Sequence, residues 1–253
     1  MHYGLDSSDE VEPAQAPRLP PAEKRRFVRR VFDRIARSYD AMNLLISLGQ
    51  TSVWRARALS GLNLPPGSRV LDVGCGTGWV VRRLRAHYPG ILVEGMDLSP
   101  NMIAQAYRRD PGGTYLVGDV GAIPHPDDTY DLVTTVFTLR NFPDLAAASR
   151  EMLRVLRPGG LLVVLDTFPP EGAARAWRLW HRFWLSSVVP ALVRPFADPT
   201  AYRYMAASIF AHVPVSRYVA LLADLGASEV STGSYSLGTA TRVVARKPRV
   251  VRN

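Results

Sequence analysis

The chain has 253 residues, 47% of them hydrophobic, and a formal net charge of +9. This length suffices for one large core, and the longest apolar runs, such as 161–165, fall far short of the ~20 residues of a membrane-spanning helix. The single cysteine, Cys75, excludes an internal disulfide and a cysteine metal cluster, and the five histidines lack metal-ligand spacing, so we expect no metal. Nearly all of the basicity is arginine, and such a surface favours nucleic acid or anionic lipid.

The N-terminal part predicts a leader followed by helices. Residues 1–21 combine prolines, acids and small residues, which predicts a disordered leader. Apolar residues then recur at helical spacing from 22 to about 36, and a further helical stretch covers 54–59. We interpret 22–66 as a helical cover over substrate and cofactor. The first residues lack the basic and apolar regions of a secretion signal, so we expect a cytoplasmic protein.

Strands and helices alternate in the next part, at 67–167. The pattern predicts strands at 70–73, 91–97, 114–119, 131–137 and 161–166. Helices are predicted between them at 77–87, 100–108 and 144–156. This order is typical of a doubly wound, Rossmann-like α/β sheet with parallel strands.

The alternation of strands and helices ends after the fifth predicted strand. We interpret 168–212 as a helical insertion on the acceptor side, a lid over the active site. A last helix at 215–225 and two β-rich stretches, 228–235 and 239–247, predict a terminal antiparallel hairpin that completes the core over 213–247. We expect residues 248–253 to form a tail.

The segment VLDVGCGTGW, residues 70–79, places three glycines directly behind the first strand. Glycines are kept where φ is positive or where a ligand approaches the backbone. Two ligands fit this position: a dinucleotide pyrophosphate or the amino-acid end of S-adenosylmethionine. The spacing is GxGxG, whereas the dinucleotide fingerprint is GxGxxG. Asp97 ends the second strand, where a carboxylate accepts from ribose hydroxyls, and Asp119 ends the third, where it would receive the adenine amino group.

The motifs DVGCGTG, GMDLSPNMI and VGDV, in this order, strongly resemble those of class I S-adenosylmethionine-dependent methyltransferases. The resemblance implies S-adenosylmethionine as cofactor, S-adenosylhomocysteine as product, and no metal. It implies these cofactor-binding residues: Asp72, Gly74, Gly76, Thr77, Gly78, Asp97, Leu98, Met102, Asp119, Val120, Val136 and Tyr39. The glycine loop would hold the methionine end, with a hydroxyl contact from Thr77.

Other motifs resemble those of the C-methyltransferases of ubiquinone and menaquinone biosynthesis. They are YDAMN at 39–43, LRN at 139–141 and YRYMAASI at 202–209. The resemblance implies methyl transfer to a ring carbon of a polyprenylated quinol, and we favour a demethylmenaquinone-type naphthoquinol. It implies Arg140, Asn141, Tyr39 and Asp97 as catalytic residues, and Asn43, Met42, Phe137, Tyr202 and Tyr204 as substrate-binding residues.

Arg140 has a physical reason for its expected role. A guanidinium keeps its charge in a dry site and stabilises a developing oxyanion on the ring. The resemblance also brings Tyr39 into a hydrogen-bonded network with Asp97 and Arg140. Asn141 would orient the ring oxygen or a relay water, and we expect a water or a carboxylate to carry the ring proton away.

The chain also departs from this family on the acceptor side. DTFPP at 166–170 lacks the lysine that members often have, and 237–242 lacks their histidine. Another small lipidic or phenolic acceptor is therefore the alternative. The charge leaves nucleic-acid methylation as a further class, although no nucleic-acid motif is present, and a catalytically silent cofactor-binding protein is a third.

The stretch 173–184 suggests a contact with lipid. As a helix it places Trp177, Trp180 and Trp184 on one face and arginines on another. This pattern suits an interfacial helix or a lid over a prenyl tail, and an ordinary packed helix is the alternative. Peripheral membrane contact and a homodimer stay open, and no nucleic-acid partner is expected.

Overall fold

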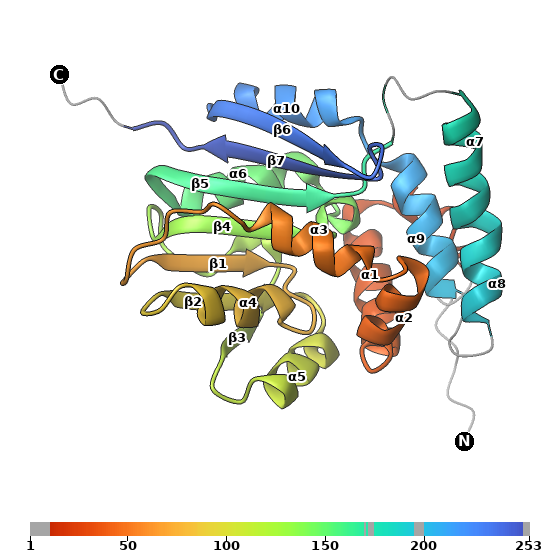
Figure 1. Cartoon of the computed structure of the whole chain (residues 1–253), viewed down its shortest axis with the longest axis horizontal. Helices are drawn as coiled ribbons and strands as arrows, with labels where there is room; N and C mark the ends of the chain where they lie inside the picture. The colour runs from red at the N-terminus through yellow and green to blue at the C-terminus, as the bar shows by residue number, and fades with distance from the viewer. Residues whose placement is uncertain (1–10, 170, 172–174, 195–199, 250–253) are drawn as a thin grey trace.

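The computed structural model describes residues 11–169, 171, 175–194 and 200–249. Within them the chain forms a seven-stranded sheet with the order β3-β2-β1-β4-β5-β7-β6 (Figure 1). Neighbouring strands from β3 to β5 are parallel, and β7 is antiparallel to both of its neighbours. The strands are β1 (Arg69–Val73), β2 (Leu92–Asp97), β3 (Thr114–Val117), β4 (Tyr130–Val136), β5 (Leu156–Asp166), β6 (Ser228–Tyr235) and β7 (Ala240–Arg246). The predicted α/β sheet with a terminal hairpin is confirmed.

Helices surround this sheet and cap one end of it. They are α1 (Pro21–Ile35), α2 (Tyr39–Ile46), α3 (Gln50–Ala58), α4 (Trp79–His87), α5 (Pro100–Arg109), α6 (Leu145–Val155), α7 (Arg175–Phe183), α8 (Val189–Val193), α9 (Thr200–Ala211) and α10 (Val215–Asp224). Shorter turns are η2 (Ala16–Arg18), η3 (Val120–Ala122), η4 (Leu139–Asn141) and the π-helical η5 (Trp184–Val188). Side-chain caps define the first residues of α5 and α6. Ser99 accepts from the Met102 amide at 3.1 Å, and Asp144 accepts from the Ala147 amide at 2.9 Å.

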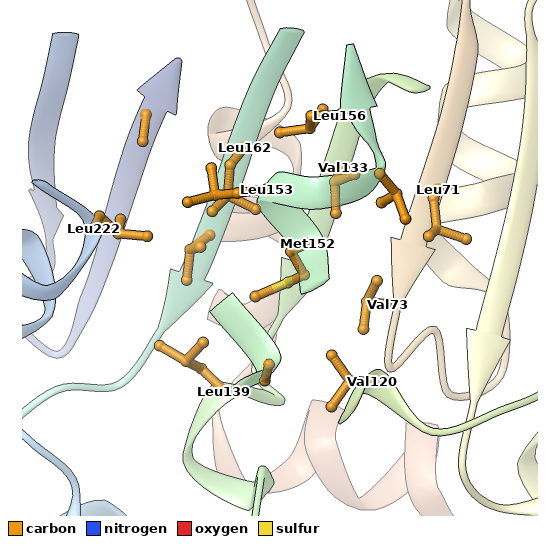
Figure 2. Close-up of a cluster of buried hydrophobic side chains, with 14 of the residues drawn as sticks. Leu71, Val73, Val120, Val133, Leu139, Met152, Leu153, Leu156, Leu162 and Leu222 are labelled. Carbon is orange, nitrogen blue, oxygen red and sulfur yellow. The ribbon is translucent and has the colours of Figure 1, made fainter. Parts of the chain in front are cut away.

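Successive side chains along the strands point to opposite faces of the sheet, and both faces are buried. Val70 and Leu132 point to the face that α4 covers, whereas Leu71 and Val133 point to the opposite face. Figure 2 shows this second face, where Met152 of α6 packs on the sheet. Because both faces are covered, the parallel strands read as nearly continuous apolar runs.

A third core lies beyond the carboxyl ends of the parallel strands. Helices α1, α2, α8 and α9 pack together there, and α7 lies on the same side of the sheet (Figure 1). Helix α3 instead packs on the face that α4 covers, through Trp54 and Ala58. The rings of Phe27 in α1 and Tyr204 in α9 meet edge to face at 5.2 Å. Helices α1 and α2 of the N-terminal segment and α8 and α9 of the insertion thus form one helical layer over the edge where a doubly wound sheet binds ligands.

Two local expectations differ from the structure. Part of the leader predicted at 1–21 is ordered, because Ala16 in η2 is fully buried in the third core; residues 1–10 lie outside the described part. Strand β5 begins at Leu156, five residues before the predicted start. A register shift between Tyr130 and Leu132 accommodates the extra residues, and the Gly159 amide donates to the Lys247 carbonyl at 2.8 Å.

Among the described residues, no single helix is long and apolar enough to cross a membrane. The bent pair α9 and α10, with 68° between the two helices, meets the length and composition criteria only when taken together.

Candidate functional site

The glycine loop follows β1 and turns into α4. The amides of Gly74 and Cys75 both donate to the Met96 carbonyl, at 2.7 and 3.0 Å, which fixes the turn against β2. Gly74 has φ of +71°, and a Cβ there would lie 2.2 Å from the Thr138 side chain. The loop therefore requires glycine at position 74 for both its backbone conformation and its contact with the segment after β4.

The carboxylate of Asp97 organises the other side of this turn. One oxygen accepts from the Gly76 amide at 2.8 Å, and the other accepts from the Ser99 amide at 2.9 Å. Desolvation in the cleft raises the pKa of Asp97 to about 6, although these two hydrogen bonds oppose the shift. The carboxylate is thus fixed at the strand end with lone pairs left for a ligand.

Behind the loop lies a buried carboxyl, Asp72. It accepts from the Thr134 hydroxyl at 2.7 Å, and burial raises its pKa to about 7. The nearby Arg55 guanidinium lowers this pKa in part, and it also lies over the rings of Trp79 and Phe137 at 5.5 and 5.6 Å from their centres. The Asp72 carboxyl therefore joins the end of β1 to β4 through Thr134.

Thr77 is engaged within the protein. Its hydroxyl donates to Asp40 of α2, 2.9 and 3.0 Å from the two carboxylate oxygens, and Asp40 also pairs with Arg109 of α5. This hydroxyl ties α2 to the glycine loop, whereas the sequence predicted a cofactor contact. Its partner Asp40 was missed, although it stands within the YDAMN motif.

Two cavities meet at the carboxyl edge of the sheet. The small cavity, of about 60 Å³, lies against the glycine loop, Asp97 and η3. The large cavity, of about 360 Å³, lies between the helices of the third core and the end of β4. Both are lined by Phe32, Tyr39, Phe137 and Asn141.

Most of the predicted residues line these spaces. The small cavity holds Gly74, Gly76, Asp97, Leu98, Met102, Asp119 and Val120, and the large one holds Asn43, Arg140, Tyr202 and Tyr204. Asp72, Thr77 and Val136 line a third, minor space of about 20 Å³ behind the loop. Two predicted residues line none of the three: Met42 is buried in the third core, and a Cβ at Gly78 would lie 2.6 Å from the Tyr115 hydroxyl.

Arg140 is held by a partner that sequence reasoning missed. Its Nη1 donates to Asp166 at 2.7 Å and to the Phe137 carbonyl at 2.8 Å. Asp166 is fully buried at the end of β5 and also accepts from the Thr167 amide at 2.7 Å. The guanidinium is thus fixed at the cavity wall by a buried ion pair. The sequence signal that could have predicted this pair is the position of Asp166 at the end of β5, the strand next to β4.

Several polar atoms at the wall of the large cavity are buried without a hydrogen-bond partner among the described residues. They are Nε of Arg140, both amide atoms of Asn141, and the hydroxyls of Tyr202 and Tyr204. Such groups are costly unless a ligand or water pairs with them. Their grouping beside an apolar cavity indicates a site for a molecule that is largely apolar and carries a few oxygens.

The expected network of Tyr39, Asp97 and Arg140 is not formed by direct bonds in the described residues. Asp97 pairs with backbone amides and Arg140 pairs with Asp166, while Tyr39 lies between the two cavities. Tyr39 packs edge to face on Phe32 at 6.0 Å. Tyr39 is thus one of the four residues that line both cavities.

Two further contacts hold the cover in place. The Lys24 ammonium of α1 donates to the Phe142 carbonyl at 2.8 Å, and burial lowers the pKa of Lys24 to about 8. Asp119 pairs with Arg25 of α1 at 2.5 Å and caps η3 through the Gly121 amide at 2.9 Å. Helix α1 is thus fastened to both sides of the small cavity.

Comparison with known proteins identifies the family. Residues 21–247 match the model of the ubiE/COQ5 methyltransferase family. The chain belongs to this family. The methyltransferase is 36% identical to a demethylmenaquinone methyltransferase of Roseiflexus sp. (strain RS-1), with 87% of this chain and 93% of the relative covered. It is 33% identical to a ubiquinone/menaquinone biosynthesis C-methyltransferase of Geobacter sulfurreducens, over 89% of this chain and 90% of the relative.

Solved structures agree on the fold. A possible histamine N-methyltransferase of Thermotoga maritima has a TM-score of 0.64 at 18% identity and covers 87% of this methyltransferase and 99% of its own chain. A putative methyltransferase of Haloferax volcanii, solved with its activator Trm112, has the same TM-score at 19% identity, over 86% and 98% of the two chains. At these identities the likeness concerns the fold alone.

Proposed function

We propose that this methyltransferase transfers a methyl group from S-adenosylmethionine to a ring carbon of a polyprenylated quinol, with a demethylmenaquinone-type naphthoquinol as the favoured acceptor. The observation that carries the proposal is the pair of adjoining cavities, one at the glycine loop and one apolar, which share Phe32, Tyr39, Phe137 and Asn141. The names of the relatives support the same acceptor class.

The residues of the small cavity fit the methyl donor. Gly74 and Gly76 leave the backbone open to an amino-acid group, and Asp97 lies at the strand end that suits a ribose diol. Leu98, Met102 and Val120 supply an apolar wall for an adenine ring, next to Asp119. When bound, S-adenosylmethionine supplies an electrophilic methyl group on a sulfonium. The protein then has to align the acceptor with it and exclude water.

Arg140 and Asn141 provide the polar end of the acceptor site. Loss of the proton from a quinol hydroxyl places negative charge on oxygen and electron density on the neighbouring ring carbon. Arg140, oriented by Asp166, stabilises that oxygen, and the unpaired amide of Asn141 orients it. The ring carbon would then form its bond to the methyl group as the sulfonium–methyl bond breaks, with S-adenosylhomocysteine as the leaving group. A water or a carboxylate would take the ring proton, which restores aromaticity.

The rest of the large cavity suits a prenyl chain. Its wall is built from aliphatic and aromatic side chains of the cover and the insertion, including Ile35, Ile46, Trp177, Trp184 and Leu185. Burial there also lowers the pKa of His181, because desolvation disfavours the charged imidazolium. An apolar wall with one polar end matches an amphiphile whose ring is its only polar part.

Transfer of an isotope-labelled methyl group tests the proposal. The wild type and Arg140→Ala would each receive labelled S-adenosylmethionine with reduced prenyl naphthoquinol or prenyl benzoquinol. We expect label on a ring carbon of the naphthoquinol, and loss of label in Arg140→Ala while donor binding persists. Tight donor binding with no label on either quinol would refute the quinone assignment and direct the search to other lipidic or phenolic acceptors.

A further inference from the structure

Exposed apolar side chains occur on the segments that line the large cavity. Leu237 is 77% exposed and Leu48 is 71% exposed, the highest values among the large hydrophobic residues of the described part. We call the following set the apolar rim: Leu44, Leu48, Leu179, Trp180, Phe183 and Leu237. Exposed large apolar side chains on segments that line one cavity are typical of a surface that binds another phase or molecule.

The rim belongs to the cavity. Leu48, Gln50, Trp180 and Ser236 line the large cavity and are themselves exposed, so the cavity reaches the surface between them. These residues come from the α2–α3 turn, from α7 and from the β6–β7 turn, which share one side of the molecule (Figure 1). A molecule that leaves the cavity passes between the rim side chains.

Two turns of the rim are held in place. The Ser236 hydroxyl lies 2.8 Å from Gln50 Oε1 and accepts from the Trp54 indole at 3.0 Å. Leu48 and Leu237 have φ of 50° and 57°, a left-handed conformation that costs free energy for residues other than glycine. The hydrogen bonds between the turns thus keep two leucines pointed into solvent at an energetic cost.

The charge of the chain is concentrated in the same segments. Residues 44–58, 175–194, 200–212 and 234–242 contain no aspartate or glutamate. They contain eight of the 31 basic residues: Arg55, Arg57, Arg175, Arg178, Arg182, Arg194, Arg203 and Arg242. Because the whole chain has a net charge of +9, the remaining residues are close to neutral. Apolar side chains among arginines without acids are typical of a surface for anionic lipid headgroups.

We propose that the apolar rim docks on an anionic lipid bilayer, with its leucines and aromatic rings in the headgroup region. The exposed arginines of the same segments, Arg57, Arg182, Arg194 and Arg203, would then contact lipid phosphates, whereas Arg55 is buried beside Asp72. Docking places the mouth of the large cavity at the bilayer. A prenylated acceptor then enters without exposing its chain to water; this transfer step rests on the proposed function, whereas the docking does not.

Vesicle co-sedimentation of the full chain tests the docking. The probes are phosphatidylcholine vesicles and vesicles of phosphatidylcholine with phosphatidylglycerol. The variant is the triple substitution Leu179→Glu, Phe183→Glu and Leu237→Glu, none of which lines the cavity. The matched control is Leu92→Glu. Leu92 is 61% exposed and lies at the start of β2, at the end of the sheet opposite to the apolar rim.

We expect the wild type and Leu92→Glu to bind the anionic vesicles, and more weakly at high salt. The triple variant should bind them at least about tenfold more weakly. Methylation of a short-chain quinol in detergent should be equal in all three, which separates a docking defect from a failure of the proposed function. Equal vesicle binding by the triple variant and the control would overturn the proposal. A dimer that the triple variant converts to a monomer, with vesicle binding unchanged, would assign the face to self-association.

Discussion

The buried pair of Asp166 and Arg140 offers the sharpest test of the site. Asp166 is fully buried, the Arg140 side chain is 10% exposed, and their oxygen and nitrogen lie 2.7 Å apart. Removal of one partner from such a pair typically costs about 3–5 kcal/mol, since the other charge stays buried. Asp166→Asn keeps the shape and an acceptor oxygen for Arg140, so we expect a loss of about 2–3 kcal/mol in the free energy of unfolding.

The same substitution should slow the chemical step. A guanidinium that is no longer held by a carboxylate loses about one charge-assisted hydrogen bond to the ring oxygen in the transition state. That loss corresponds to a kcat about 10- to 100-fold lower, while the KM for S-adenosylmethionine stays unchanged because Asp166 lines neither the small cavity nor the glycine loop.

Urea unfolding and steady-state methyl transfer measure the two effects. Glu229→Gln is the matched control, because the Arg246–Glu229 pair has a similar distance of 2.8 Å but side chains that are 31% and 68% exposed. Its loss should be below about 1 kcal/mol. If Asp166→Asn lowers the free energy of unfolding by no more than this control does, the buried pair does not stabilise the fold as expected. Lost stability with an unchanged kcat would limit Asp166 to a structural role.

Three further predictions concern the small cavity. Gly74→Ala places a Cβ 2.2 Å from the Thr138 side chain, so calorimetry should show an affinity for S-adenosylmethionine that is at least about tenfold lower. The control is Gly61→Ala, because Gly61 has a similar φ of +70° but open space around it. This control should lower the free energy of unfolding by only about 1–2 kcal/mol and leave the affinity unchanged. Asn141→Ala removes an amide that has no partner in the described structure, so thermal unfolding should change little while methyl transfer falls; a large loss of stability would contradict this. Donor affinity should weaken by up to about tenfold per pH unit as the pH falls below about 6, because protonation of Asp97 removes its negative charge, and an equal pH dependence in Asp97→Asn would refute this assignment.

The sheet could be predicted from the sequence because its signals are local. Apolar runs such as 70–73 and 131–137 mark strands that are buried on both faces, and glycines or caps end them within a few residues. The start of β5 was missed because it depends on pairing with Tyr130 and Lys247, which lie 26 and 91 residues from Leu156 along the chain. Such non-local pairing leaves no periodic trace in the strand itself.

The site could be predicted only in part for the same reason. Motifs identified Arg140, Asn141 and Asp97, which the fold places at one sheet edge. No motif showed that Thr77 faces Asp40 or that Arg140 faces Asp166, since these partners are set by how α2 and β5 pack. Side-chain direction therefore needed the tertiary structure, whereas strand-end position did not.

The chain's single thiol has a practical consequence. Cys75 is buried in the glycine loop, and a Cβ at Gly95 would lie 2.9 Å from its sulfur. Burial raises the pKa of this thiol well above its ordinary value, and only the thiolate reacts with maleimides or iodoacetamides. A Leu237→Cys variant would thus accept a fluorophore at that position alone in the folded state. Alkylation of Cys75 itself would report, by mass, each opening of the turn between β1 and α4.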